Sequence, residues 1–164
     1  MKDIDIKNEY GRFKLRVSAV VIKDNYVLLE KAKKYFSYIF PGGHVELGET
    51  SIEALYRETK EELNCNINNY KLICALENIY PIDNITAQEI NYFYELDTDI
   101  KMKEKEFTLE EIDKGIKKIH EYVWIPIDKI ENYEVYPKVL RSLIKNKNTI
   151  KLHYVMIAIL TKSK

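Results

Sequence analysis

Apolar runs alternate with turn-forming residues along the first third of the chain. Lys14 to Ile22 has apolar residues at alternate positions and then continuously, which predicts a central strand. Asp24-Asn25 is typical of a tight turn, and Tyr26 to Glu30 predicts the returning strand of a hairpin. The basic and aromatic stretch from Lys31 to Tyr38 predicts a loop, and His44 to Glu46 predicts a short strand.

An amphipathic helix is predicted after this region. Thr50 followed by Glu53 forms a capping box, so the helix should begin at about Ser51. At about 100° per residue, acidic residues share one face of this helix and apolar residues occupy the neighbouring face. We expect the apolar stripe to pack on a core and the acidic stripe to face a cleft. The acidic residues are Glu58, Glu61 and Glu62, and the neighbouring stripe is Ile52, Leu55, Thr59 and Leu63.

The second half of the chain predicts more strands and a second helix. Tyr70 to Tyr80 and Glu89 to Leu96 predict a long hairpin, with Pro81 to Thr86 as its connection. Strands on both sides of one helix, followed by a late helix, predict an α/β fold with a mixed sheet between helices. The remaining predicted elements are a short helix capped by Thr108 and Glu111 and ending at Gly115, a strand over Tyr122–Pro126, a helical turn over Ile127–Tyr133, a helix over Pro137–Lys145 and a strand over Ile150–Leu160.

Length and composition narrow the possible classes of protein. The 164 residues predict one compact domain over residues 1–164. Because 26 basic residues balance 26 acidic ones, no overall charge favours nucleic acid or an anionic membrane. The charged N-terminus lacks a signal-peptide pattern, and the apolar run from Tyr154 to Leu160 is far shorter than the roughly 20 residues of a membrane span. Cys65 and Cys74 have no metal-ligand spacing, and we expect a reduced, cytoplasmic protein.

The acidic residues around the first helix indicate a cation site. Carboxylates gathered on one helix face repel one another unless a cation lies among them. Lys60 is the only lysine in the helix, and it lies outside the acidic arc. The alternative is a solvated charged face, but such a face needs neither the Pro41-Gly42-Gly43 turn nor Glu49 upstream of the helix. Carboxylate oxygens favour hard divalent cations.

The spacing of these residues resembles a known family signature. From Gly43 to Cys65 the chain follows the pattern G-x5-E-x7-R-E-x-x-E-E, which is similar to the box of the Nudix (MutT-like) hydrolases. These enzymes cleave nucleoside diphosphates linked to another group. The resemblance covers about residues 15 to 145 and implies an α/β/α sandwich. Asn64 replaces the usual glycine and Thr59 a usual aliphatic residue, and neither change removes a metal ligand.

The resemblance also implies roles for individual residues. Members of the family use one to three Mg²⁺ ions while water attacks a phosphorus of the diphosphate. The resemblance implies that Glu58, Glu61 and Glu62 are metal ligands, together with the backbone carbonyl of Gly43. Glu49 would lie in or next to the metal site, held in place by Arg57. The implied catalytic residues are therefore Glu61, Glu49 and Arg57.

The general base is left open by the sequence. In the family it is a box glutamate or one from a later loop, so Glu61 is one candidate. His120 is another, because an imidazole titrates near neutral pH. The later, charged stretch offers four acidic candidates, and the alternative is that they are ordinary charged residues on the surface. Those candidates are Glu106, Glu110, Glu111 and Glu121.

Substrate-binding residues are predicted by residue type alone. Guanidinium and ammonium groups suit phosphate oxygens, and aromatic rings stack on nucleobases. Glu77 interrupts an apolar strand, so it faces either the cleft or a polar partner at a sheet edge. Pro81 follows Cys65 by sixteen residues, a placement that resembles the ADP-ribose pyrophosphatase subgroup. The phosphate candidates are Arg12, Arg16 and Lys33, and the stacking candidates are Tyr35, Phe36, Tyr38 and Tyr80.

The function that follows is a Mg²⁺-dependent pyrophosphohydrolase acting on a nucleotide or nucleoside diphosphate derivative. The alternative is a catalytically inactive nucleotide-binding regulator with the same fold, which an eroded box would indicate. An RNA-decapping enzyme would be expected to show a basic groove. Substrate identity, the number of metal ions and the oligomeric state stay open, and the resemblance makes a homodimer one candidate, because dimers are frequent in similar proteins.

Overall fold

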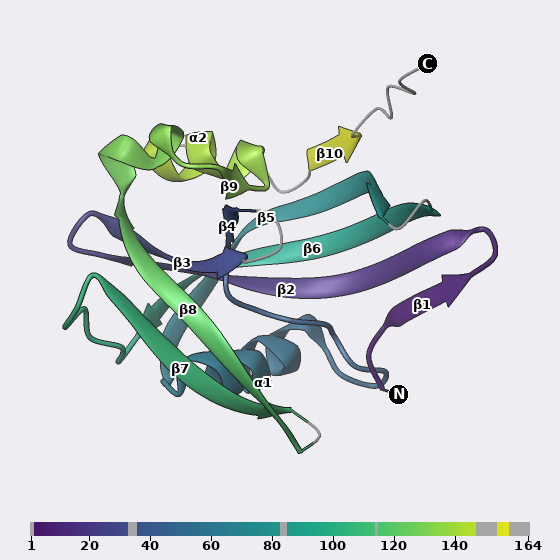
Figure 1. The fold of residues 1–164 in the computed structure, drawn as a ribbon, viewed down its shortest axis with the longest axis horizontal. Helices are drawn as coiled ribbons and strands as arrows, with labels where there is room; N and C mark the ends of the chain where they lie inside the picture. Colours follow the sequence, from purple (N-terminus) through teal and green to yellow (C-terminus); the bar gives the residue numbers. More distant parts are fainter. Residues whose placement is uncertain (1, 33–35, 83–84, 114, 147–153, 158–164) are drawn as a thin grey trace.

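The computed structural model describes residues 2–32, 36–82, 85–113, 115–146 and 154–157, and Figure 1 shows their arrangement. Within these residues, no helix is long and apolar enough to cross a bilayer. The elements are β1 (Asp5–Asn8), β2 (Gly11–Lys23), β3 (Tyr26–Ala32), β4 (Ser37–Ile39), α1 (Ser51–Leu63), β5 (Ile67–Ile82), β6 (Ile85–Thr98), β7 (Glu106–Asp113), β8 (Ile116–Pro126), the 3₁₀ helix η2 (Ile127–Asn132), β9 (Val135–Tyr136), α2 (Lys138–Asn146) and β10 (Tyr154–Ile157).

Two groups of strands diverge from the hairpin of β2 and β3. These two strands pair only at Ile22 with Val27 and at Lys23 with Tyr26, beside a turn in which Asp24 has a positive φ of 47°. β2 then pairs with β1 and, in parallel, with β6, which pairs with β5 and through it with β10. β3 instead pairs with β8 and β4, and these pair with β7 and β9. The strands of the two groups thus separate as they leave the turn.

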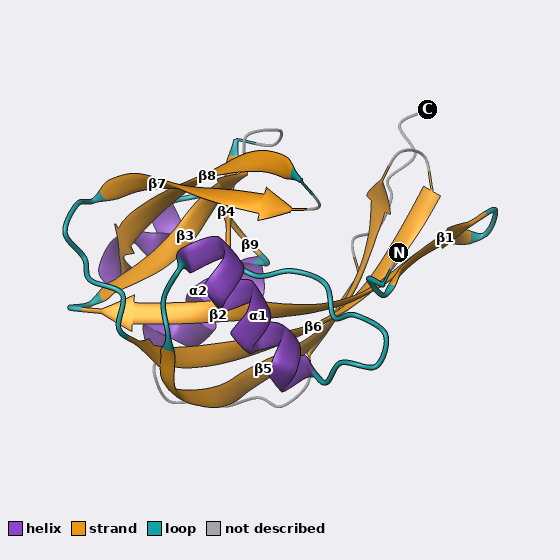
Figure 2. Cartoon of the chain, turned by 90° about the horizontal axis from the view of Figure 1, so that it is seen from below, coloured by secondary structure: helices purple, strands orange, loops and turns teal. Residues whose placement is uncertain are grey.

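The two helices lie on opposite sides of these strands. In Figure 1, α1 lies below β2 and behind the β7–β8 hairpin, whereas α2 lies above β3, and in Figure 2 α1 crosses the face turned to the viewer. Leu55 and Leu63 of α1 are buried in one core with Trp124. Leu140 and Ile144 of α2 are buried in a second core. The mixed sheet between helices confirms the predicted fold class.

The helix termini follow the local signals in the sequence. The hydroxyl of Thr50 accepts a hydrogen bond from the backbone N–H of Glu53 at 3.2 Å, and the Glu53 carboxylate accepts one from the Thr50 N–H at 2.8 Å. Asn64 ends α1 in the left-handed conformation, with φ 47° and ψ 36°. The sequence predicts a second helix over Pro137–Lys145, and α2 matches it within one residue at each end. The two helices predicted to begin at Ser51 and Pro137 are therefore confirmed.

The prediction of a short helix between Thr108 and Gly115 is wrong. β7 and β8 form an antiparallel hairpin, with Gly115 in its turn at φ 81°. Phe107 and Leu109 alternate with exposed residues and pack against the core, and the ring of Phe107 lies 5.5 Å from that of Tyr122. Burial of these apolar residues at a period of two outweighs a capping pattern of two residues.

Other boundaries differ because strand pairing continues beyond the apolar residues. β5 extends to Ile82 and β6 begins at Ile85, so the predicted connection from Pro81 to Thr86 is mostly strand. The predicted loop from Lys31 to Tyr38 likewise contains the end of β3 and the start of β4.

Two further predictions are met only in part. His44 to Glu46 makes only isolated bridges, Arg16 with His44 and Asp3 with Glu46, and forms no named strand. Of the terminal strand predicted over Ile150–Leu160, the described part is β10, which pairs in parallel with β5. The rest of that prediction lies outside the described residues.

Candidate active site

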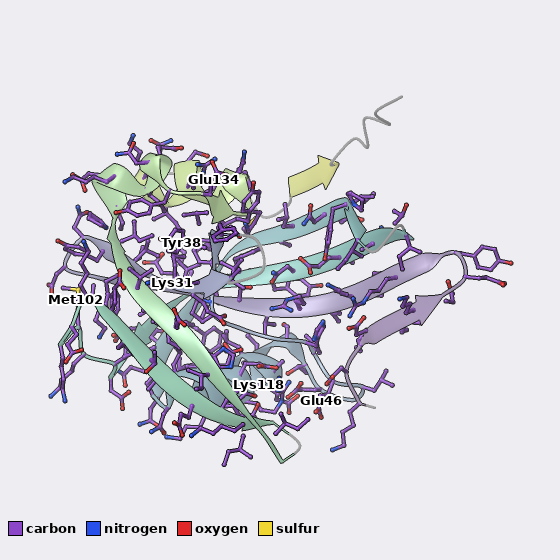
Figure 3. The ribbon with its side chains drawn as sticks, viewed as in Figure 1. Lys31, Tyr38, Glu46, Met102, Lys118 and Glu134 are labelled. Atoms are coloured by element: carbon purple, nitrogen blue, oxygen red, sulfur yellow. The ribbon has the colours of Figure 1, made fainter. Side chains whose placement is uncertain are left out.

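A cavity of about 590 Å³ lies between α1, the loop before it and the β7–β8 hairpin. Figure 3 shows two of its lining residues, Glu46 and Lys118, beside α1. We call it the acidic cavity, because carboxylates dominate its lining. These carboxylates belong to Asp3, Glu30, Glu46, Glu58, Glu61, Glu62 and Glu111, and the basic groups belong to Arg16, His44, Arg57, Lys118 and His120.

The glycine turn before α1 lies directly against two of these carboxylates. A Cβ atom built on Gly43 would lie 2.2 Å from the carboxylate of Glu58, so no other residue leaves that carboxylate in place. The backbone N–H of Gly42 donates to Oε2 of Glu62 at 2.8 Å. The carbonyl of Gly43 accepts a hydrogen bond from the N–H of Val17 at 3.0 Å. The turn therefore fixes two carboxylates of α1 by direct contact.

Arg57 organises the other carboxylates through a fork of hydrogen bonds. Its Nε and Nη2 atoms donate to the two oxygens of Glu49 at 2.9 and 2.8 Å. Nη1 donates to Glu58 at 2.7 Å and to Glu61 at 3.2 Å, and Nη2 also donates to the backbone carbonyl of His44 at 2.9 Å. The hydrogen bonds from Arg57 lower the pKa of Glu49, which keeps that carboxylate ionised. The ion pair between Arg57 and Glu49 is the one that the sequence predicts.

Glu62 is the most deeply buried carboxylate of the acidic cavity. It is 8% exposed, and burial together with the nearby charges of Glu30 and Glu58 raises its pKa to about 7. Burial also raises the pKa of Glu58. A cation bound next to these two carboxylates would favour their ionised forms.

His120 connects two carboxylates opposite α1. Its Nδ1 atom lies 2.8 Å from Glu30 of β3, and its Nε2 atom lies 2.9 Å from Glu111 of β7. Burial disfavours the charged ring, but Glu30, Glu62 and Glu111 together outweigh it through charge and hydrogen bonding, and they raise the pKa of His120. Only a doubly protonated ring donates to both partners. Ligand atoms of Glu62, Glu111 and His120 lie within 4.8 Å of one another.

The donor set fits a hard divalent cation. It offers several carboxylate oxygens and few nitrogen donors, which suits Mg²⁺ or Mn²⁺ better than softer metals. Burial is the main cause of the raised pKa values of Glu58 and Glu62, and a bound cation would favour the ionised form of both carboxylates.

The candidate bases separate into two groups. Glu61 lines the acidic cavity at the exposed edge of α1, with 47% of its side chain accessible. Glu111 and His120 line the same cavity from the hairpin, because β7 and β8 turn these two side chains toward α1. The other three do not line it: Glu106 pairs with Lys31, Glu110 pairs with Lys117, and Glu121 lies opposite Thr108 on the outer face.

A second cavity of about 350 Å³ adjoins the acidic one and contains two predicted substrate-binding residues. Arg16 lines both cavities and donates to the carbonyl of Gly42 at 2.7 Å. Tyr80 lines the second cavity, where its hydroxyl accepts a hydrogen bond from Lys14 at 3.1 Å and donates to Glu89 at 3.4 Å. Arg16 is thus the side chain that the two cavities share.

The remaining substrate candidates are placed elsewhere or not described. Tyr38 packs edge-on against Tyr133 at 5.6 Å, on the α2 side of the strands and far from the residues labelled beside α1 in Figure 3. Glu77 lies on β5 between β6 and β10 and lines neither the acidic nor the second cavity. Arg12 is paired with Asp5, and Phe36 is 94% exposed. Lys33 and Tyr35 lie outside the described residues.

Glu30 is one of the cavity residues that sequence reasoning missed, and the others with charged or titratable side chains are Asp3, His44, Glu46 and Lys118. Glu30 follows the buried run Val27-Leu28-Leu29 directly, so its only local signal is a charge at the end of an apolar strand. Its contact with His120 joins residues 90 positions apart, and no local pattern indicates that contact.

Comparison with known proteins agrees with this geometry. A family model of the NUDIX domain matches residues 12–145. An RNA pyrophosphohydrolase of Francisella tularensis is 31% identical over 72 residues, which is 43% of this chain and 46% of that protein, so less than half of the relative's length is matched.

Solved structures share the fold. A MutT protein of Bacillus halodurans has a TM-score of 0.66 at 16% identity, with 90% of this chain and 91% of that chain covered. A MutT NUDIX hydrolase of Burkholderia pseudomallei has a TM-score of 0.56 at 19% identity, with 84% and 98% covered. The NUDIX model covers most of this chain, and the residues of the acidic box line one cavity. The chain therefore belongs to the Nudix family of hydrolases, which cleave pyrophosphate bonds.

Proposed function

We propose that the protein is a Mg²⁺-dependent pyrophosphohydrolase that cleaves the diphosphate bond of a nucleotide or nucleoside diphosphate derivative by attack of water at phosphorus. One observation carries this proposal: a buried cluster of carboxylates with raised pKa values adjoins a second cavity across Arg16. The cluster provides a place for the cation and the diphosphate, and the second cavity provides a place for the attached group.

Residues of α1 and of the glycine turn would hold the cation. These are Glu58, Glu61 and Glu62, with the carbonyl of Gly43, which has a second lone pair besides the one that Val17 uses. When bound, Mg²⁺ neutralises the diphosphate, polarises its oxygens and lowers the pKa of water. Arg57 and Glu49 keep the α1 carboxylates in position, because Arg57 bonds to Glu58 and Glu61 from a fixed pair with Glu49.

Glu111 is the base that the geometry supports best among the candidates. It faces α1 across the acidic cavity, and His120 fixes one of its oxygens at 2.9 Å. A carboxylate held in this way can take a proton from water that attacks phosphorus. Arg16 would bind an oxygen of the diphosphate between the two cavities, since a guanidinium matches phosphate oxygens. Glu61 is the alternative base, at the exposed edge of the same cavity.

A panel of substrates tests the proposal. The purified protein would be incubated with Mg²⁺ and with ADP-ribose, dinucleoside polyphosphates and nucleoside triphosphates. We expect turnover of at least one compound, and a loss of about 100-fold or more in Glu58→Gln and Glu62→Gln. Glu53→Gln is the matched control on the same helix, because glutamine also completes a capping box. If no pyrophosphate compound is hydrolysed with Mg²⁺ or Mn²⁺, the proposal is wrong, and binding without turnover would favour the regulator.

A second candidate substrate is the 5′ end of RNA. The relative from Francisella tularensis, named as an RNA pyrophosphohydrolase, is the observation that favours it. The balanced charge of the chain does not, because binding to a polyanion usually requires a basic surface. Comparing kcat/KM for a 5′-triphosphorylated oligonucleotide with that for the matching free nucleotide decides between them.

A further inference from the structure

The wall of the second cavity contains a buried hydrogen-bond acceptor that lacks a partner. Asn91 of β6 is 6% exposed, and its Nδ2 atom donates to the hydroxyl of Ser18 at 3.0 Å. Among the described residues no donor reaches its Oδ1 atom. Buried acceptors without a partner are destabilising and rare in folded proteins. Oδ1 itself is covered in the ligand-free protein, but Asn91 lines a cavity, so a small rotation of its side chain would let a ligand supply the missing donor.

Three other polar groups of the cavity wall differ from Asn91, because they bond to one another. Lys14 donates to the hydroxyl of Tyr80 at 3.1 Å and lies over its ring at 5.6 Å. Tyr80 in turn donates to Glu89 at 3.4 Å. These three side chains form a closed set on β2, β5 and β6. The unmet acceptor of Asn91 is therefore specific to this residue and not a general property of the cavity wall.

The position of Asn91 relates it to the diphosphate site. In the register of β2 and β6, Asn91 is the direct partner of Arg16, which also lines the acidic cavity. A group covalently attached to a diphosphate at Arg16 would therefore lie beside Asn91. Phe40, Phe93 and Tyr136 also line this cavity; the two phenylalanines are buried, whereas Tyr136 is 42% exposed and can lie against a flat ligand.

We propose that Asn91 determines substrate specificity by accepting a hydrogen bond at Oδ1 from an N–H group of a nucleobase in the second cavity. The inference rests on the proposed function and adds the chemistry of the group beyond the diphosphate. A hydrogen bond to a buried acceptor discriminates strongly, because a ligand without the donor leaves that acceptor unpaired.

Calorimetric titration tests this on whole protein in Mg²⁺. The ligands are AMP, CMP, GMP, UMP and ribose 5-phosphate, which keeps the sugar phosphate and lacks the base. We expect Asn91→Leu to weaken binding of at least one nucleoside monophosphate about tenfold or more and to leave ribose 5-phosphate unchanged. Asn78→Leu, from β5 in the same cavity wall, is the matched control and should retain the preference. Equal loss for both ligand types, unchanged affinity, or no binding of any nucleoside monophosphate would overturn the inference.

Thermal unfolding adds a readout that separates recognition from structure. Because Asn91→Leu removes an unsatisfied acceptor, the Tm of the ligand-free variant should equal or exceed that of the wild type. A lower Tm would instead assign Asn91 a structural role through Ser18, and it would count against the inference.

Nuclear magnetic resonance of the wild type decides the matter if the leucine variant does not fold. The side-chain amide resonance of Asn91 should shift with a nucleoside monophosphate and stay in place with ribose 5-phosphate. Equal shifts would mean that Asn91 contacts the sugar phosphate, and the inference would fail. Base-dependent binding without any hydrolysis would instead reject the proposed function and leave this inference standing.

Discussion

At the scale of single residues, the site depends on close contacts that permit few substitutions. Gly43 leaves room for the carboxylate of Glu58, and Arg57 holds Glu49, Glu58 and Glu61 together. The pairing of Arg57 with Glu49 could be predicted, because both residues belong to one short pattern. The contacts of Glu30 could not, because β3 and β8 come together only in the folded sheet.

Gly43→Ala tests the fit between the turn and α1. The added Cβ would overlap the carboxylate of Glu58, so we expect metal affinity and turnover to fall about tenfold or more. Because Glu58→Asp shortens the side chain, the double variant should lose less than the sum of the two single losses. Additive losses in a double-mutant cycle would contradict direct contact.

The buried Glu62 predicts how stability depends on pH in metal-free protein. Its folded-state pKa is raised from 4.5 to about 7, so the folded protein favours the protonated form. Its contribution is therefore fully present below about pH 4.5 and is lost as the pH rises toward 7. In EDTA, the Tm of wild type should fall relative to Glu62→Gln between these pH values. Parallel curves of Tm against pH for the two proteins would rule this out.

At the scale of elements, local and distant interactions differ in how far they can be predicted. The ends of α1 follow from Thr50, Glu53 and Asn64, which act within a few residues of sequence. The sequence wrongly predicts a helix in the region of β7, because the strand is stabilised by packing of Phe107 and Leu109 against residues of other elements and by pairing with β8. A helix at this position does not indicate that Glu111 and His120 lie on neighbouring strands and face α1 together.

Glu30→Gln tests the link from β3 through His120 to Glu111. Without the Glu30 carboxylate, His120 loses the partner that favours its charged form and no longer holds Glu111 in one orientation. We expect kcat to fall about 10- to 100-fold with little change in KM. Glu106→Gln is the control, because Glu106 lies on the β7–β8 hairpin but pairs with Lys31 outside the acidic cavity. This variant should retain normal rates. A change in KM alone would show that Glu30 affects binding and not positioning.

At the scale of the whole molecule, the site exists because separate segments meet around one cavity. The glycine turn, α1, β3 and the β7–β8 hairpin each contribute side chains to the acidic cavity. The divergence of β2 and β3 after two paired positions creates this arrangement, and it depends on long-range pairing that no local pattern specifies. The sequence predicted the family and the box, whereas the two cavities and their connection emerged only from the fold.

A cation bound among these segments should stabilise the whole fold. Mg²⁺ or Mn²⁺ at about 100 times its Kd would add about 2.7 kcal/mol to the free energy of unfolding. We therefore expect a saturable rise in Tm that EDTA reverses and that Glu58→Gln largely abolishes. The control Glu53→Gln should respond as wild type does. A Tm that does not depend on either metal would contradict a divalent cation site.

Because Arg16 borders both cavities, the proposed function ties the two halves of a substrate to one side chain. Under that proposal, any exchange at Arg16 would alter bond cleavage and ligand choice at once, so this position is poorly suited to gradual divergence. Positions on β5 and β6, such as Tyr80 and Asn91, border the second cavity alone. A duplicated copy of this gene could therefore acquire a new preference there while keeping its original chemistry.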